Sequence, residues 1–182
     1  QGTRMNSDLP KLLHQVAAAP LLHHALATAH SLDPSRIVVV TGHEGQAVAA
    51  SATAYSEAVD CVVQDPQLGT AHAVAQAAPL LADAEGEAVV LYADTPLIRE
   101  ETLRKMLDAR SRHAVVILGF HAKDPGRYGR LLTKDSNLLA IREFDVATEA
   151  ERAITLCNSG VVCAEASLLL SLVAEVKDDN PK

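Results

Sequence analysis

Short apolar runs that alternate with helical patterns restrict the possible folds of this chain more than any other feature. Residues 37–41 are an unbroken run of Ile, Val and Thr, and similar runs occupy residues 61–64, 88–92 and 114–118. Continuous rather than alternating apolar strands are typical of a sheet that is covered on both faces, as parallel sheets are. The runs therefore predict the strands of an α/β protein.

Helical patterns separate these runs. Apolar residues recur at the spacing of one helix face within residues 22–29 and again within residues 103–107. An alanine-rich stretch over residues 71–78 predicts a third helix, with Thr70 as its N-cap and Pro79 ending it. Strands that alternate with helices predict a Rossmann-like, doubly wound and mainly parallel sheet.

The second half of the chain predicts an antiparallel excursion that is added to this sheet. In chain order the pattern favours a hairpin of two strands, a short helix, a strand and a final helix, which cover residues 129–133, 138–143, 147–153, 155–163 and 169–176. No internal repeat or linker divides the chain, so we expect residues 1–182 to form a single domain. Neither end supplies the element that the sheet requires there, and we expect the domain to be incomplete at both ends.

Composition excludes several classes of protein. The 182 residues include 16 Lys and Arg against 23 Asp and Glu, a formal charge of −7. This acidic balance does not supply the basic face that nucleic acid requires, and no apolar run approaches the ~20 residues that span a bilayer. We therefore expect neither a nucleic-acid nor a membrane partner. Three cysteines, two of them in apolar runs, favour buried thiols in a reducing, cytoplasmic setting.

Cations and glycine occur together near the start of the chain. Gly2, Thr3 and Arg4 precede Lys11 by a few residues. Glycine lets backbone amides approach a phosphate, while Arg and Lys neutralise its charge. On this segment alone, the pattern favours a solvated terminus that carries ordinary surface cations.

Two strand ends carry polar residues. Asp94 follows the run at residues 88–92, at the carboxyl end of a strand where open α/β sheets bind ligands, and one such carboxylate suits Mg²⁺. Gln64 ends another run, and Gly69 precedes the helix that starts near Thr70, so these residues could read a base edge at a helix N-terminus. Each segment is also compatible with an ordinary turn or a strand–helix loop.

Polar residues also interrupt the later strands. Glu143 and Asn158 lie in or beside apolar runs, either lining a cavity or occupying an exposed edge. The eight histidines show no metal-ligand spacing, and we expect them at surface or capping positions.

Taken together, these segments resemble the uridylyltransferase domain of the bacterial N-acetylglucosamine-1-phosphate uridylyltransferases, bifunctional enzymes that make UDP-N-acetylglucosamine. The resemblance covers nearly the whole chain in order and spacing. The matching stretches are residues 2–5, 7–11, 64, 67–73, 91–98, 128–130, 141–143 and 158–160. The resemblance implies a nucleotide-diphospho-sugar transferase fold and the conversion of UTP and N-acetylglucosamine-1-phosphate to UDP-N-acetylglucosamine and pyrophosphate, for cell-wall precursor synthesis.

The resemblance also implies roles for the phosphate-binding and metal-binding positions. Arg4 and Lys11 would contact the nucleotide phosphates and the pyrophosphate, with Gly2 and Thr3 in the same loop. Asp94 would bind Mg²⁺, and we count it with Arg4 and Lys11 as catalytic.

The remaining matched positions would hold the two halves of the product. Gln64, Gly69 and Thr70 would bind uracil and its ribose, and Tyr92 and Ala93 would line the nucleotide. Hydrogen bonds to N-acetylglucosamine are implied for a third group, which consists of Gly129, Glu143 and Asn158. We therefore expect the carboxylate at residue 94, the early cations and the polar groups of the later strands to share one site.

The chain departs from the family at several points. Ala93 stands where the family has glycine, and the family's first strand, second metal ligand and C-terminal left-handed β-helix have no counterpart in residues 1–182. A homotrimer is expected only where that β-helix is present. Two alternatives stay open: another sugar-phosphate or cofactor nucleotidyltransferase, and a non-catalytic nucleotide-sugar binding module.

Overall fold

The computed structural model describes residues 7–42, 45–135 and 137–176. Its strands are β1 (Gln15–Val16), β2 (Ala19–Pro20), β3 (Ile37–Gly42), β4 (Val59–Gln64), β5 (Glu87–Val90), β6 (Val115–His121), β7 (Arg130–Lys134), β8 (Asn137–Arg142) and β9 (Leu156–Glu165). Its helices are α1 (Leu21–His30), α2 (Gln46–Tyr55), α3 (Thr70–Gln76), α4 (Ala78–Leu81), α5 (Glu100–Arg110), α6 (Glu149–Arg152) and α7 (Ala166–Glu175), with 3₁₀ turns η1 (Lys11–Leu13) and η2 (Phe144–Val146). No helix in the three described segments has the length and apolar character that a membrane span requires.

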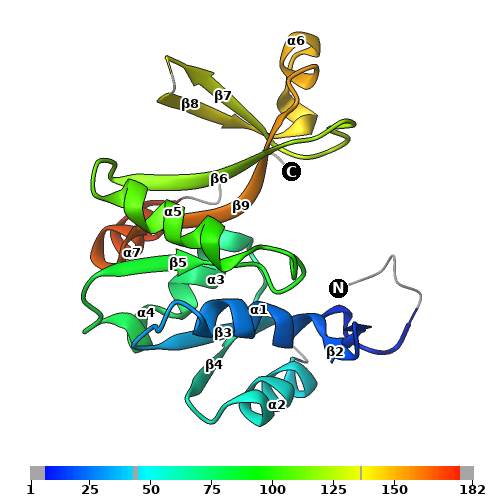
Figure 1. The fold of residues 1–182 in the computed structure, drawn as a ribbon, viewed down its shortest axis with the longest axis vertical. Coiled ribbons are helices and arrows are strands. Elements are labelled where there is room, and N and C mark those ends of the chain that lie inside the picture. Colours follow the sequence, from blue (N-terminus) through cyan, green and yellow to red (C-terminus); the bar gives the residue numbers. More distant parts are fainter. Residues whose placement is uncertain (1–6, 43–44, 136, 177–182) are drawn as a thin grey trace.

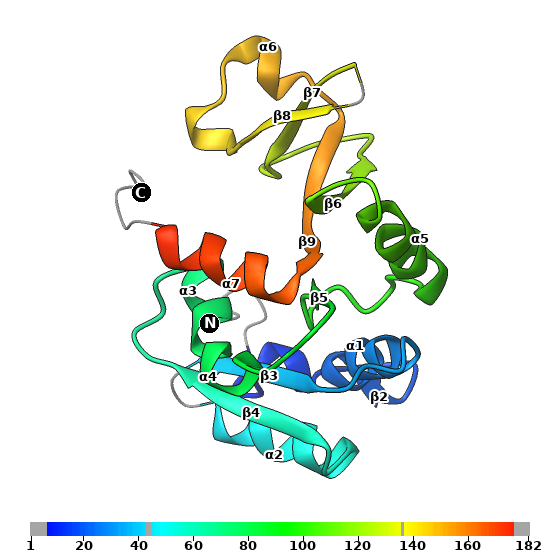
Figure 2. The same ribbon diagram turned by 90° about the vertical axis from the view of Figure 1, so that its left-hand side faces the viewer.

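Strand β9 connects the hairpin of β7 and β8 to strands β5 and β6. Strands β3 and β4 pair in parallel, whereas β9 runs antiparallel to β5, β6 and β7, and β8 completes a hairpin with β7. In Figure 1 the hairpin and α6 lie at one end, and β9 descends from them alongside β6. Figure 2 shows the same strand ending near α7, which lies beside α3.

The α/β class and the antiparallel excursion agree with the sequence prediction. Antiparallel pairing extends further than the hairpin, because β9 returns from the excursion and inserts between β5 and β6. Cys163 of β9 faces Val89 on one side and Val116 on the other. The residue is fully buried there, as expected for a cysteine in an apolar run.

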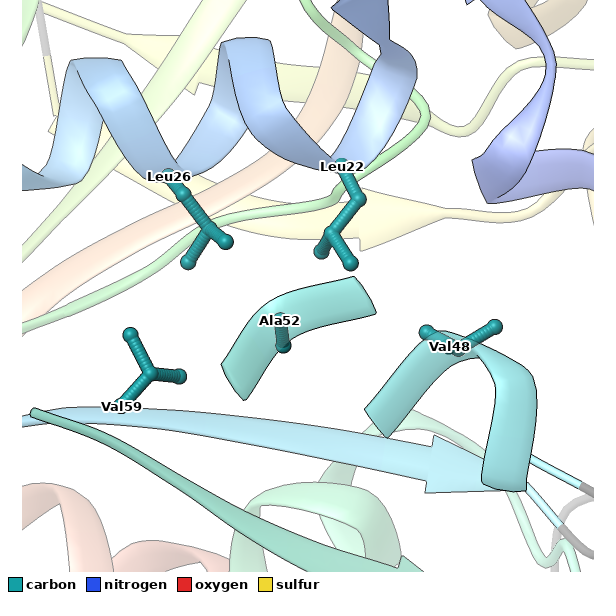
Figure 3. Close-up of a cluster of buried hydrophobic side chains, with 5 residues drawn as sticks. All are labelled: Leu22, Leu26, Val48, Ala52 and Val59. Carbon is teal, nitrogen blue, oxygen red and sulfur yellow. The ribbon is translucent and has the colours of Figure 1, made fainter. Parts of the chain in front are cut away.

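Two apolar clusters pack helices against the strands. The first joins α1 and α2 to β4, and Figure 3 shows its buried side chains: Leu22, Leu26, Val48, Ala52 and Val59. The second packs Leu103 and Met106 of α5 against Val161 and Cys163 of β9. The apolar spacing that predicted α1 and α5 thus corresponds to the helix faces that are buried.

Two predicted features of the alanine-rich helix are wrong. Gly69, with φ +101°, occupies the N-cap position of α3, and Thr70 is the first helical residue without a capping hydrogen bond from its side chain. The Thr70 hydroxyl is instead bonded to Tyr92. Pro79 does not end a continuous helix but lies in the first turn of α4, where the missing N–H of proline is tolerated.

Candidate active site

Lys11 and Asp94 form the charged part of the site. Asp94 follows β5 in a turn in which Thr95 donates from its amide and its hydroxyl to the Tyr92 carbonyl, at 3.1 and 2.7 Å. Lys11 Nζ lies 2.6 Å from Asp94 Oδ2, although the residues are 83 positions apart in sequence. The predicted proximity of this cation and this acid is confirmed. An ion pair so exposed contributes only about 0–1 kcal/mol to stability, so its interest is its position.

The Asp94 side chain is a carboxylate that could hold a metal ion together with a substrate. Its side chain is 35% exposed, and the described residues contain no cluster of three or more His, Cys, Asp or Glu side chains that could enclose a metal ion. Mg²⁺ keeps several waters and is commonly held by one or two carboxylates together with substrate phosphates. A single, accessible carboxylate could therefore hold this ion when it arrives with a nucleotide, whose phosphates would attract the neighbouring Lys11 ammonium.

Gln64 is held in place at the end of β4. It is 8% exposed, and its Nε2 donates to the Gly69 carbonyl at 2.8 Å and to His72 Nδ1 at 3.0 Å. The positive φ of Gly69 turns the chain so that its carbonyl faces this amide. His72, expected at a surface or capping position, is partly buried and in turn contacts Gln76. The amide nitrogen of Gln64 is thus occupied by the protein.

A bulge in β9 displaces the strand at Asn158 and Gly160. Ile117 faces Val162, but two residues later in β6 the partner of Gly119 is Asn158, so β9 uses four residues where β6 uses two. Bulges re-aim side chains beside active sites. Gly160 takes φ +86°, and its amide donates to Asn158 Oδ1 at 2.9 Å.

Tyr92 connects the β9 bulge to the start of α3. Its hydroxyl donates to Thr70 Oγ1 at 3.1 Å. Its ring lies against Gly160, where an added Cβ would come within 2.6 Å of a ring carbon. Asp94 follows two residues later, so Tyr92 lies between the charged pair, the helix start and the bulge.

Gly129, Glu143 and Asn158 form a second group. The backbone amide of Asn158 donates to the Gly129 carbonyl at 2.8 Å. The Glu143 carboxylate lies so close to Gly129 that a Cβ there would be 2.9 Å from Oε1. Glu143 is exposed and follows β8, whereas Asn158 is partly buried. Contacts through Gly160 and Tyr92 link these three residues to Thr70 at the start of α3, which follows the Gly69 that Gln64 contacts.

The contacts therefore join most of the positions that the sequence predicted for a site. Ala93 packs against the first apolar cluster beside them. Gly2, Thr3 and Arg4 lie outside the described residues. Sequence reasoning assigned no role to Gly160, and the only available signal was its place in the matched stretch 158–160.

The fold that carries these residues is that of the sugar-phosphate nucleotidyltransferases. It overlays with a TM-score of 0.78 on a Bacillus anthracis protein described as a glucose-1-phosphate thymidylyltransferase, over 95% of this chain and 69% of that one, at 18% identity. It overlays with a TM-score of 0.74 on a UDP-glucose pyrophosphorylase complexed with UDP-glucose, over 97% and 76% of the two chains, at 15% identity.

The profile of the MobA-like NTP transferase domain matches residues 1–169, and the chain belongs to this family. It is 67% identical over 180 residues to the bifunctional protein GlmU of Cereibacter sphaeroides strain ATCC 17023, and 51% identical over 180 residues to that of Ruegeria sp. strain TM1040. Each match covers 99% of this chain and 40% of the relative, so the chain spans about two fifths of these proteins. The resemblance and the fold class that the sequence predicted are confirmed.

Proposed function

We propose that this chain is the uridylyltransferase part of an enzyme that makes UDP-N-acetylglucosamine from UTP and N-acetylglucosamine-1-phosphate. The observation that carries the proposal is the continuous set of contacts from Gln64 through Tyr92 and Gly160 to Asn158. Residues that the resemblance assigns to the nucleotide and residues that it assigns to the sugar are neighbours. The 67% identity to a GlmU over nearly the full chain supports the same activity.

Gln64 accounts for a preference for uracil. Because its amide nitrogen already donates to Gly69 and His72, the amide oxygen is the group left for a base. Uracil offers an N–H donor at its N3 position, whereas cytosine offers an acceptor there. A hydrogen-bonding site rejects a partner that leaves a buried polar group unpaired. We therefore expect UTP to be selected over CTP.

Lys11, Arg4 and Asp94 act on the phosphates. Lys11 and Arg4 would neutralise the phosphate charge that grows as pyrophosphate leaves, and Asp94 would hold Mg²⁺, which supplies further charge neutralisation when bound. An oxygen of the sugar-1-phosphate attacks the α-phosphorus of UTP in line, forming the new P–O bond as the bond to pyrophosphate breaks. The attacking phosphate is already ionised, so the reaction needs positioning more than it needs a general base.

Asn158, Glu143 and Gly129 would orient the sugar. The Asn158 side-chain oxygen accepts from the Gly160 amide, so the Asn158 NH₂ group is the donor that would serve a ligand acceptor. The carboxylate of Glu143 is an acceptor for sugar hydroxyl or acetamido protons.

The thiols of all three cysteines are free in the described residues, which supports the expected cytoplasmic setting. We propose a homotrimer only where the C-terminal β-helix that the resemblance implies is present.

Release of pyrophosphate from UTP and N-acetylglucosamine-1-phosphate tests the proposal. We expect Mg²⁺-dependent turnover with UTP that drops sharply with CTP, whose base offers no donor at N3 to the Gln64 amide oxygen. Equal turnover with CTP would assign the chain to another nucleotidyltransferase activity. Binding of UDP-N-acetylglucosamine without turnover would instead identify a binding module.

A further inference from the structure

Arg130 is a buried cation that serves the backbone. It is 2% exposed, and among the described residues its guanidinium donates hydrogen bonds only to main-chain carbonyls. The acceptors are Pro125 O at 3.5 Å, Gly126 O at 3.0 Å, Tyr128 O, and Arg152 O at 3.1 Å from Nη2 and 3.3 Å from Nε. No carboxylate lies within ion-pair distance of Arg130 in the part of the chain that the structure describes. The carbonyl dipoles therefore compensate the charge.

This arrangement does something that an apolar side chain cannot do. A buried charge is costly unless it is hydrogen-bonded, and a well-packed apolar residue is often as stable in its place. The planar fork of arginine, however, gathers several acceptors in one fixed geometry, which a lysine ammonium cannot reproduce. Arg130 thereby fastens the loop before β7 to the end of α6.

The loop and strands that Arg130 contacts contain or adjoin the three residues assigned to the sugar, Gly129, Glu143 and Asn158. Gly129 is its chain neighbour, and Cys157, which faces Arg130 across β7 and β9, immediately precedes Asn158. Phe144 follows Glu143, and its ring centre lies 5.8 Å from the Arg130 guanidinium carbon. Each of the three residues assigned to the sugar is therefore adjacent to a group that Arg130 contacts or pairs with.

We infer that Arg130 is a positioning residue for the sugar-phosphate acceptor. It acts through Gly129, Glu143 and Asn158 and leaves the uracil contacts at Gln64 alone. This inference rests on the proposed function and adds to it a residue that positions the groups assigned to the sugar. It predicts a change in one Michaelis constant and not in the other.

Steady-state kinetics of Arg130→Lys and Arg130→Met test the inference. Loss of hydrogen bonds to a charged group commonly weakens an interaction on the order of tenfold or more, so we expect KM for N-acetylglucosamine-1-phosphate to rise by about that factor. KM for UTP stays unchanged in the same variants. Arg130→Lys keeps the charge but not the fork, and we expect it to rescue little of the loss.

Arg110→Lys is the matched control. Arg110 is also largely buried, with an 11% exposed side chain, but it lies at the end of α5 and pairs at 2.7 Å with Glu87, at the start of β5. We expect both Michaelis constants to stay at their wild-type values in this variant. If the Arg130 variants do not fold, Phe144→Leu removes the ring beside the guanidinium, and the same selective rise in KM for the sugar phosphate is expected.

The possible outcomes separate the two claims. A wild-type protein without turnover overturns the proposed function and the inference with it. An active wild type whose Arg130 or Phe144 variants change both Michaelis constants equally, or neither, overturns the inference alone. Full rescue by lysine also overturns it, because charge would then suffice without the fork.

Discussion

Gly160→Ala perturbs the contact on which the connection between the two halves of the site depends. Gly160 has φ +86°, and a Cβ there would come within 2.6 Å of the Tyr92 ring. To reach ordinary contact at 3.4 Å the ring would have to move by about 0.8 Å, which would disturb its hydrogen bond with Thr70. Gly86 supplies a matched control, because it has φ +89° and no atom within 4 Å of the corresponding Cβ position.

The two variants share backbone strain and differ in the collision. Alanine in the left-handed region costs about 1–2 kcal/mol, so both should lose that much free energy of unfolding in urea. Gly160→Ala should lose about 1–3 kcal/mol more from overpacking, and its kcat/KM should fall on the order of tenfold through the lost hydrogen bond and displaced ring. Gly86→Ala should keep wild-type kcat/KM.

A third variant locates the effect in the ring. In a Tyr92→Ala background, Gly160→Ala should cost no more stability than Gly86→Ala does, because the colliding atoms are gone. Our reasoning is refuted if Gly160→Ala and Gly86→Ala behave alike in both assays, or if the extra cost persists without the ring.

Further predictions concern charge, metal, packing and pH. Arg4→Ala should lower turnover by orders of magnitude with an unchanged far-UV circular dichroism spectrum, and near-normal turnover would remove its role. Asp94→Asn should raise the Mg²⁺ concentration needed for half-maximal turnover, which an unchanged magnesium titration would contradict. Leu103→Ala should lower the free energy of unfolding by about 2–5 kcal/mol in urea, because Leu103 is fully buried against β9; a loss no larger than that of an exposed substitution would count against this packing. Burial raises the pKa of the Cys163 thiol to about 11 from 9.0, so the folded state holds this proton more tightly and stability should fall as pH rises through that interval. Cys163→Ala should flatten that fall in a pH series of urea titrations, and an identical slope would contradict it.

Local patterns predicted most of the elements and part of the site. The hairpin of β7 and β8 follows from a polar turn between apolar runs, and the strand-end position of Asp94 marks it as a ligand-binding candidate. The resemblance added the expectation that Asp94 lies near the early cations. The contact between Lys11 and Asp94 agrees with that expectation. Turn and strand-end patterns predict a residue's place correctly where that place depends on a single strand or helix.

Features that depend on two distant segments could not be predicted in this way. The bulge in β9 arises from its register with β6, and no spacing within residues 156–165 reveals it. The hydrogen bond that Tyr92 donates to the Thr70 hydroxyl, at the start of α3, likewise joins distant segments. The carbonyls around Arg130 come from the loop before β7 and from the end of α6, so the matched stretch 128–130 indicated importance without a mechanism.

Amide chemical shifts during titration with UDP-N-acetylglucosamine test most directly whether both halves of the product occupy one site. We expect the amides of Gly69, Thr70, Gly129, Asn158 and Gly160 to shift together with one dissociation constant, and UMP to shift only the first two strongly. Shifts confined to Gly69 and Thr70 with the full nucleotide sugar, or two unrelated dissociation constants, would contradict a shared site.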